Sequence, residues 1–122
     1  MKQFLAVPDE TIAVRILSTV PYKDRFPAGR LRPPVGIIPG TVRSLPELFL
    51  LLAPDDSSLP GINLTALVEW IDNVIGDPEL AACLRVETDK AKSYVDGCLI
   101  AFDLVGERIK QAQLAAGEDI SL

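Results

Sequence analysis

The stretch from Thr88 to Ala116 constrains the fold most, because its apolar pattern is typical of one long helix or of two collinear ones. Over 29 residues such a helix would extend about 43 Å. A compact chain of this length has a diameter of roughly 35 Å. The helix must therefore project, bend at Gly97 or Gly106, or lie against a second copy or another protein. The apolar residues recur at spacings of three and four: Ala91, Tyr94, Val95, Cys98, Phe102, Val105, Ile109 and Ala112.

The middle of this stretch, residues 98–105, is apolar at every position except Asp103. It has no broad polar face for water, so both of its sides should be covered, and Asp103 should find an arginine partner in the basic arm described below. Each glycine inside a helix costs about 1 kcal/mol relative to alanine. Close approach of another backbone is one reason to tolerate that cost. We expect Leu99, Phe102 and Leu104 to bind a partner.

Three shorter helices are predicted before it. Ser44, with Glu47 three residues later, forms a capping-box pattern for a core helix up to residue 53. Asn63 caps a second helix over 64–75, and Gly76-Asp77-Pro78 ends it and starts a third that runs to about residue 85. Trp70 lies at the edge of the apolar stripe of the second helix. It suits either a lid over the core or an exposed anchor for a partner.

The first twenty residues leave two alternatives open. Residues 11–20 place β-branched side chains on alternate positions, which favours a strand. Residues 4–7 could pair with it through a turn at 8–10. A helix over 9–18 competes, because Ile12, Ile16 and Thr19 also share a helical face. We predict the strand or hairpin.

Residues 21–46 differ in kind, since six prolines and three glycines preclude an ordinary helix. We predict a proline-rich extended arm wrapped over the surface. Its apolar residues Val35, Ile37 and Ile38 should dock, because burial of such a side chain contributes about 1.5 to 3 kcal/mol.

Charge divides the chain into two parts. Residues 1–46 hold seven basic and three acidic side chains, a balance of +4, whereas 47–122 hold five basic and fourteen acidic ones, a balance of −9. The arm interleaves positive charge with aromatic rings, as in proteins that bind single-stranded nucleic acid. The acidic pI of about 4.6 opposes that use, so nucleic-acid binding is the alternative hypothesis. The residues concerned are Tyr22, Lys23, Arg25, Phe26, Arg30 and Arg32.

Several classes of chemistry lack their residues. The chain has no histidine, which removes Ser-His-Asp and Cys-His catalysis and the histidine zinc sites. The carboxylates at 89, 96, 103 and 107 share a rough helical face, but they lack the spacing of a calcium loop. We expect a solvated face there, no metal and no cofactor. Cys83 and Cys98 should be two buried reduced thiols.

These patterns predict a mainly α domain over 1–122, with α+β as the alternative. It comprises an N-terminal strand or hairpin (1–20), the proline-rich basic arm (21–46), a helical core of about four helices around the long C-terminal one (47–116) and a tail (117–122). The apolar run at the N-terminus is too short for a signal peptide and no segment reaches membrane-spanning length, so we expect a cytoplasmic protein. The predicted function is non-enzymatic: an interaction or assembly module that acts through the long helix, as a homo-oligomer or with a protein partner.

Overall fold

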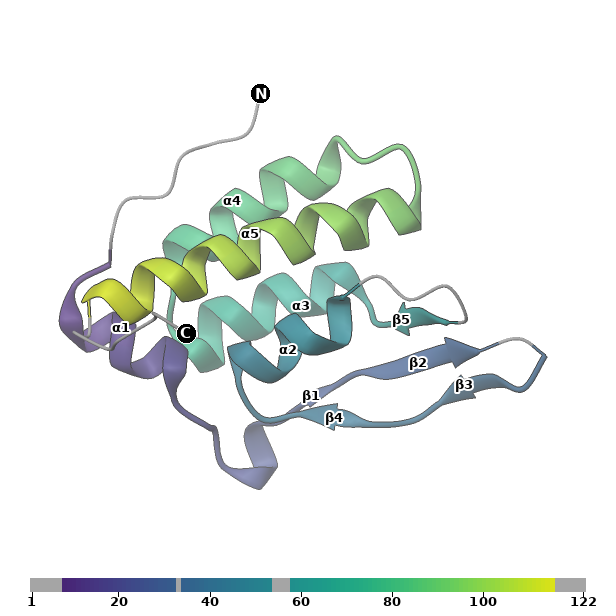
Figure 1. The fold of residues 1–122 in the computed structure, drawn as a ribbon, viewed down its shortest axis with the longest axis horizontal. Helices are drawn as coiled ribbons and strands as arrows, with labels where there is room; N and C mark the ends of the chain where they lie inside the picture. Colours follow the sequence, from purple (N-terminus) through teal and green to yellow (C-terminus); the bar gives the residue numbers. More distant parts are fainter. Residues whose placement is uncertain (1–7, 33, 54–57, 116–122) are drawn as a thin grey trace.

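The computed structural model describes residues 8–32, 34–53 and 58–115, and this part is mainly helical with a small antiparallel sheet (Figure 1). The mainly α fold with a long C-terminal helix is confirmed. A 3-10 turn covers Tyr22–Asp24, and a π-helical turn at Ile71–Ile75 continues the third helix. The α-helices are α1 (Glu10–Leu17), α2 (Leu45–Leu52), α3 (Leu64–Trp70), α4 (Pro78–Asp89) and α5 (Tyr94–Ala115). The strands are β1 (Phe26–Pro27), β2 (Gly29–Arg32), β3 (Gly36–Ile38), β4 (Thr41–Val42) and β5 (Leu59–Gly61).

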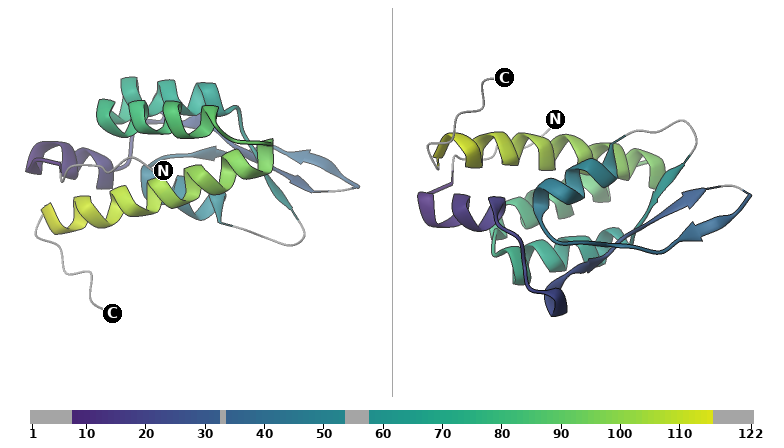
Figure 2. Two further views of the ribbon diagram at one scale, coloured as in Figure 1. Left: turned by 90° about the horizontal axis from the view of Figure 1, so that it is seen from above. Right: turned by 60° about the horizontal axis from the view of Figure 1, so that its bottom comes forward.

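Helix α5 is the element on which the others pack, since α1, α2 and α4 all contact it. Figure 2 shows α3 and α4 side by side in one layer, with α5 and α2 in the other. One hydrophobic cluster lies between them and includes the fully buried Leu48, Leu67, Ile71, Leu84 and Leu104. The outward side of α5 is left for solvent or for a partner.

The predicted helix caps are present. The side chains of Ser44, Asn63 and Asp77 accept hydrogen bonds from backbone N–H groups in the first turns of α2, α3 and α4. Gly76 ends the π-helical turn with a φ of 81°, the left-handed conformation that glycine adopts without strain. These signals act over three or four residues, so the sequence alone was sufficient to place them.

The predicted long helix is present over Tyr94–Ala115, but its predicted start at Thr88 is wrong, and residues 88–93 do not join it to a collinear helix. Helix α4 continues to Asp89, the chain turns back, and α5 begins at Tyr94 and packs against α4. Ser93 caps α5 by accepting from the Asp96 N–H at 3.1 Å, and the Asp96 carboxylate accepts from the Lys92 N–H at 3.1 Å. The 22 residues of α5 extend about 33 Å. The helix no longer exceeds the expected diameter of the domain, so its length gives no argument for a partner.

The two glycines of α5 make room for side chains of the same chain rather than for another backbone. A Cβ atom added to Gly97 would lie 2.8 Å from a methyl group of Leu64, and one added to Gly106 would lie 2.6 Å from the ring of Phe49. Both distances are shorter than van der Waals contact. These glycines therefore let α3 and α2 pack closely on α5.

The predicted strand over 11–20 is also wrong, and the competing helix is present as α1. Asp9 caps it, accepting from the Ile12 N–H at 2.9 Å. Ala13 and Ile16 are buried on the side that faces α5, so tertiary packing outweighs the strand preference of the β-branched residues. The predicted strand at 4–7 and the tail at 117–122 lie outside the described residues.

Strands are present in the N-terminal half of the chain, but within 26–42. Strand β1 pairs with β4 and β2 with β3, so the proline-rich segment forms one antiparallel hairpin, and β5 adds to the free edge of β2. A Cβ atom on Gly29 in β2 would clash with the carbonyl oxygen of Ile38 in β3, which leaves room only for glycine. Figure 1 shows the β2–β3 end projecting beyond the helices instead of lying wrapped over them.

Candidate protein-interaction surface

Trp70, a predicted partner anchor, lies inside the protein. Its side chain is only 7% exposed, and its indole N–H donates to the Asp24 carbonyl at 2.7 Å. The ring of Phe26 packs against it with centroids 5.5 Å apart. Trp70 therefore has a structural role, because it fixes the start of the arm to α3, and it is not an exposed anchor for a partner.

The three predicted contact residues of α5 have different environments. Leu104 is fully buried and is part of the core, whereas Leu99 is 43% exposed. Phe102 is partly buried and stacks on Phe49 of α2, with ring centroids 4.7 Å apart and an interplanar angle of 6°. Two of the three, Leu99 and Phe102, therefore remain accessible to a partner.

Together with their neighbours these residues form a surface that we call the α2–α5 face, made of Phe49, Leu50, Val95, Leu99 and Phe102. Val95, Leu99 and Phe102 are spaced by four and three residues, so they lie on one side of α5. Leu50 is 71% exposed, although the helix that carries it was predicted to be buried. Phe49, Leu50 and Val95 were not selected from the sequence, and the signal available was the lack of any polar face in the Leu-rich α2 segment.

A shallow groove of about 500 Å³ runs beside the stacked rings. Asp103, Glu107 and Lys110 supply the charged part of its lining, and Gly106 lines it next to Phe49. Asp103 is exposed here, so water solvates it, and the predicted arginine partner is not required. The α2–α5 face is thus apolar in the middle and mainly acidic at its border.

The predicted basic arm does not form one surface. Phe26 is buried, so its ring is not available to stack on a base. Arg30 is held within the protein, donating to the Ser58 hydroxyl at 2.8 Å and the Leu51 carbonyl at 2.6 Å. Tyr22 is exposed, with the Arg25 guanidinium 4.7 Å from its ring centroid. Lys23, which follows Tyr22 in the chain, is also exposed. Arg32 is exposed as well, but it is the last residue of β2, at the far end of the predicted arm segment.

The expected docking of Val35, Ile37 and Ile38 is not seen on residues 8–32, 34–53 and 58–115. Their side chains are 72%, 68% and 44% exposed. Strand β3, which carries two of them, is an edge strand of the described sheet, since β2 alone of the described strands pairs with it. This hairpin tip is a second exposed apolar surface, separate in the chain from the α2–α5 face.

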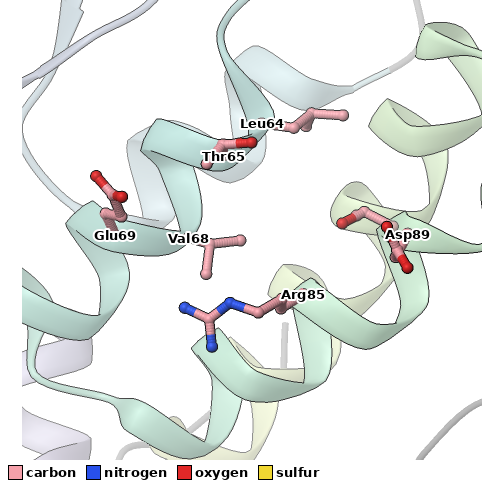
Figure 3. A pocket seen from close by; sticks show the side chains of 7 residues that line it. Leu64, Thr65, Val68, Glu69, Arg85 and Asp89 are labelled. Carbon is pink, nitrogen blue, oxygen red and sulfur yellow. The ribbon is translucent and has the colours of Figure 1, made fainter.

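A groove of about 260 Å³ lies between α3 and α4. Figure 3 shows Arg85 extending from α4 towards α3 below Val68, with Glu69 on the facing helix and Asp89 further along α4. One guanidinium between two carboxylates leaves little net charge for a ligand. The Thr88 hydroxyl, also in the lining, donates to the Leu84 carbonyl at 2.6 Å. The lining contains no pairing of a nucleophile with a general base.

The buried polar contact that sequence reasoning missed joins Asp77 to Arg108. Both side chains are almost completely inaccessible, and the carboxylate and guanidinium meet at 2.7 and 3.0 Å. Arg108 lies on the same side of α5 as buried Leu104 and Ala112. A charged residue in an otherwise apolar stripe is the signal that could have found it. The pair is enclosed by the protein, so its role is to join α4 to α5.

Four groups in the described residues have displaced pKa values with clear causes. Burial raises the pKa of Tyr94 and of the Cys98 thiol, the Tyr94 hydroxyl lying against the backbone of Pro60 and Ile62. The surface pair of Arg43 and Glu47 raises the pKa of the guanidinium and lowers that of the carboxyl, chiefly through their hydrogen bond at 2.8 Å. None of these groups lies in a catalytic arrangement.

Within residues 8–32, 34–53 and 58–115, no cluster of three or more cysteines and acidic side chains is placed to hold a metal ion. In the same ranges, no helix combines the length and the apolar character needed to cross a membrane. Comparisons with protein-family models, curated proteins and solved structures find no match to this chain.

Proposed function

We propose that this chain is a non-enzymatic interaction module that assembles with further copies of itself through the α2–α5 face. The observation that carries the proposal is the partly buried Phe49–Phe102 stack, since Leu50 follows Phe49 in α2, Leu99 lies one helical turn before Phe102 in α5, and both leucines are exposed. Aromatic side chains at the centre of an apolar patch are typical of protein–protein contacts. A charged border, supplied here by Asp103, Glu107 and Lys110, suits the polar rim of such an interface.

The packing beneath the face supports this use. Helix α5 contacts α1, α2 and α4, and it carries the fully buried Ala101, Leu104 and Val105. A surface built on a fixed helix loses little conformational entropy when it binds. The Phe49 ring is held between Phe102 and Gly106, so it is already positioned for contact.

We place this activity in the cytoplasm. Cys83 and Cys98 are both buried cysteine thiols, which suits a compartment where thiols remain reduced.

The test is the molar mass in solution, measured by light scattering on a size-exclusion column across a wide range of loading concentrations. The wild-type mass should rise from 13.2 kDa towards a multiple of it as concentration increases. Leu99→Glu places a charge in the contact, where it loses its hydration, so this variant should remain a monomer. The matched control is Val86→Glu on α4, which is 39% exposed and should assemble like the wild type.

Two results would contradict the proposal. A wild-type mass of 13.2 kDa at every concentration would exclude self-association. Assembly of the Leu99→Glu variant at wild-type strength would exclude the α2–α5 face as the contact surface. Equal thermal unfolding temperatures of the two variants would establish that the comparison concerns assembly rather than folding.

A further inference from the structure

The hairpin tip has the chemistry of a surface that enters a contact. Ile37 pairs with Leu31 across the sheet, and Leu31 pairs with Leu59 of β5. Directly paired residues place their side chains on one face, so these three form an apolar row across all three strands. Next to this row lies a groove of about 420 Å³ that Leu31 and Ile37 line together with Tyr94. It offers room for an apolar side chain from a partner.

Charge indicates which partner fits. The hairpin segment 26–42 contains two arginines and no acidic residue. Arg30 is bonded to the chain's own Ser58 and Leu51, whereas Arg32 is exposed close to the apolar tip. The surface that receives this tip should therefore be apolar in the middle and negatively charged at its border.

The α2–α5 face has that composition. Its apolar centre is Phe49, Leu99 and Phe102, and its border carries two acidic residues, Asp103 and Glu107, against one basic residue, Lys110. The part of the chain that contains it, 47–122, has a charge balance of −9, compared with +4 for 1–46. The hairpin projects beyond the helices (Figure 1), so its tip is not covered by them.

We infer that the hairpin tip of one copy, with Val35, Ile37 and Arg32, docks on the α2–α5 face of a second copy of this chain. This inference rests on the proposed function and names the partner surface of the same face. Each copy then contributes two different surfaces. Such a contact continues from copy to copy until it closes into a ring, and it leaves an open chain if the rotation does not close.

A mixing experiment distinguishes this contact from one between two identical surfaces. Ile37→Glu disables the tip and Leu99→Glu disables the face, so each variant alone should remain at 13.2 kDa in light scattering. In an equimolar mixture, the intact tip of the Leu99→Glu chain meets the intact face of the Ile37→Glu chain. The mixture should form a one-to-one pair and nothing larger, because both remaining surfaces of the pair are disabled.

Val14→Glu on α1, which is 50% exposed, is the control and should assemble like the wild type. Val35→Glu should repeat the effect of Ile37→Glu at a second position of the tip. A mixture that stays monomeric would overturn the inference, as would an Ile37→Glu variant that assembles normally. If Leu99→Glu alone prevents assembly, the proposed function stands and only its partner surface is wrong. A monomeric wild type would overturn both.

Discussion

The guanidinium of Arg108 and the carboxylate of Asp77 form an ion pair with two hydrogen bonds inside the protein, at 2.7 Å from Nε to Oδ2 and 3.0 Å from Nη2 to Oδ1. Asp77 also caps α4, accepting from the Leu80 N–H at 3.2 Å. One carboxylate therefore orients the start of α4 and holds α5 against it. Replacing Arg108 with methionine should lower the free energy of unfolding by about 3 to 5 kcal/mol, because it leaves a buried charge without its partner. Urea unfolding measures this change.

The control for that prediction is the double variant Arg108→Met with Asp77→Asn. Asparagine is also a favoured N-cap residue and carries no charge, so the uncompensated carboxylate disappears. The double variant should be more stable than Arg108→Met alone. Equal or lower stability would mean that the ion pair is not the source of the loss.

Substitutions at Gly106 and Phe49 should have coupled effects on the free energy of unfolding. Glycine to alanine inside a helix normally stabilises by about 1 kcal/mol, but the added Cβ atom would lie 2.6 Å from the Phe49 ring. Gly106→Ala should therefore give that gain only in a Phe49→Ala background. Unfolding free energies of the four proteins form a double-mutant cycle. A coupling near zero would show that the ring moves aside at no cost.

Trp70 should report whether the start of the arm is docked. Phe26 is almost fully buried against the indole, and Phe26→Ala should lower the free energy of unfolding by about 3 to 5 kcal/mol. The same variant should increase quenching of the Trp70 fluorescence by acrylamide under native conditions. Tyr22→Phe serves as the control, because Tyr22 is 80% exposed and the substitution should leave both quantities unchanged.

The raised pKa of Tyr94 predicts lower stability in alkali. Burial favours the neutral phenol in the folded protein, whereas the unfolded chain ionises near the ordinary value of about 10. The contribution of Tyr94 to stability is therefore fully present below that pH and is lost as pH rises through the folded-state pKa. Urea unfolding from neutral to alkaline pH should show a steeper fall for wild type than for Tyr94→Phe. Cys98, whose pKa is also raised, is present in both proteins.

Local signals in the sequence were sufficient where a few neighbouring residues decide the structure. Ser44, Asn63 and Asp77 each cap a helix by accepting a hydrogen bond from the backbone N–H group three residues later. Gly76 ends a helix by adopting a positive φ angle. These contacts need no knowledge of the rest of the chain. The mainly α fold followed from them together with the apolar periodicity.

The reversal between α4 and α5 was missed because periodicity records which residues are apolar and not the direction of the chain. The apolar pattern runs on through Ala91, although Ser93 and Asp96 already carry the spacing of a cap. The choice between strand and helix for α1 depended on burial of Ile16 towards α5, a contact distant in sequence.

The residues that the sequence indicates for partner contact differ in accessibility. Leu99 and Phe102 are accessible, but Leu104 and Trp70 belong to the core. Helical spacing places residues on a face, yet it does not say which face another helix covers. Phe49 belongs to a helix that the sequence predicts to be in the core. Its stacking on Phe102 depends on how α2 packs on α5, which local sequence patterns do not indicate.

An NMR dilution series with labelled leucine and valine methyl groups tests the central claim most directly. If copies assemble through the α2–α5 face, the methyl signals of Leu50, Val95 and Leu99 should shift as concentration rises. Those of Val14 and Val86, which are exposed on α1 and α4, should not move. Spectra that do not change with concentration, or shifts confined to Val14 and Val86, would contradict the account.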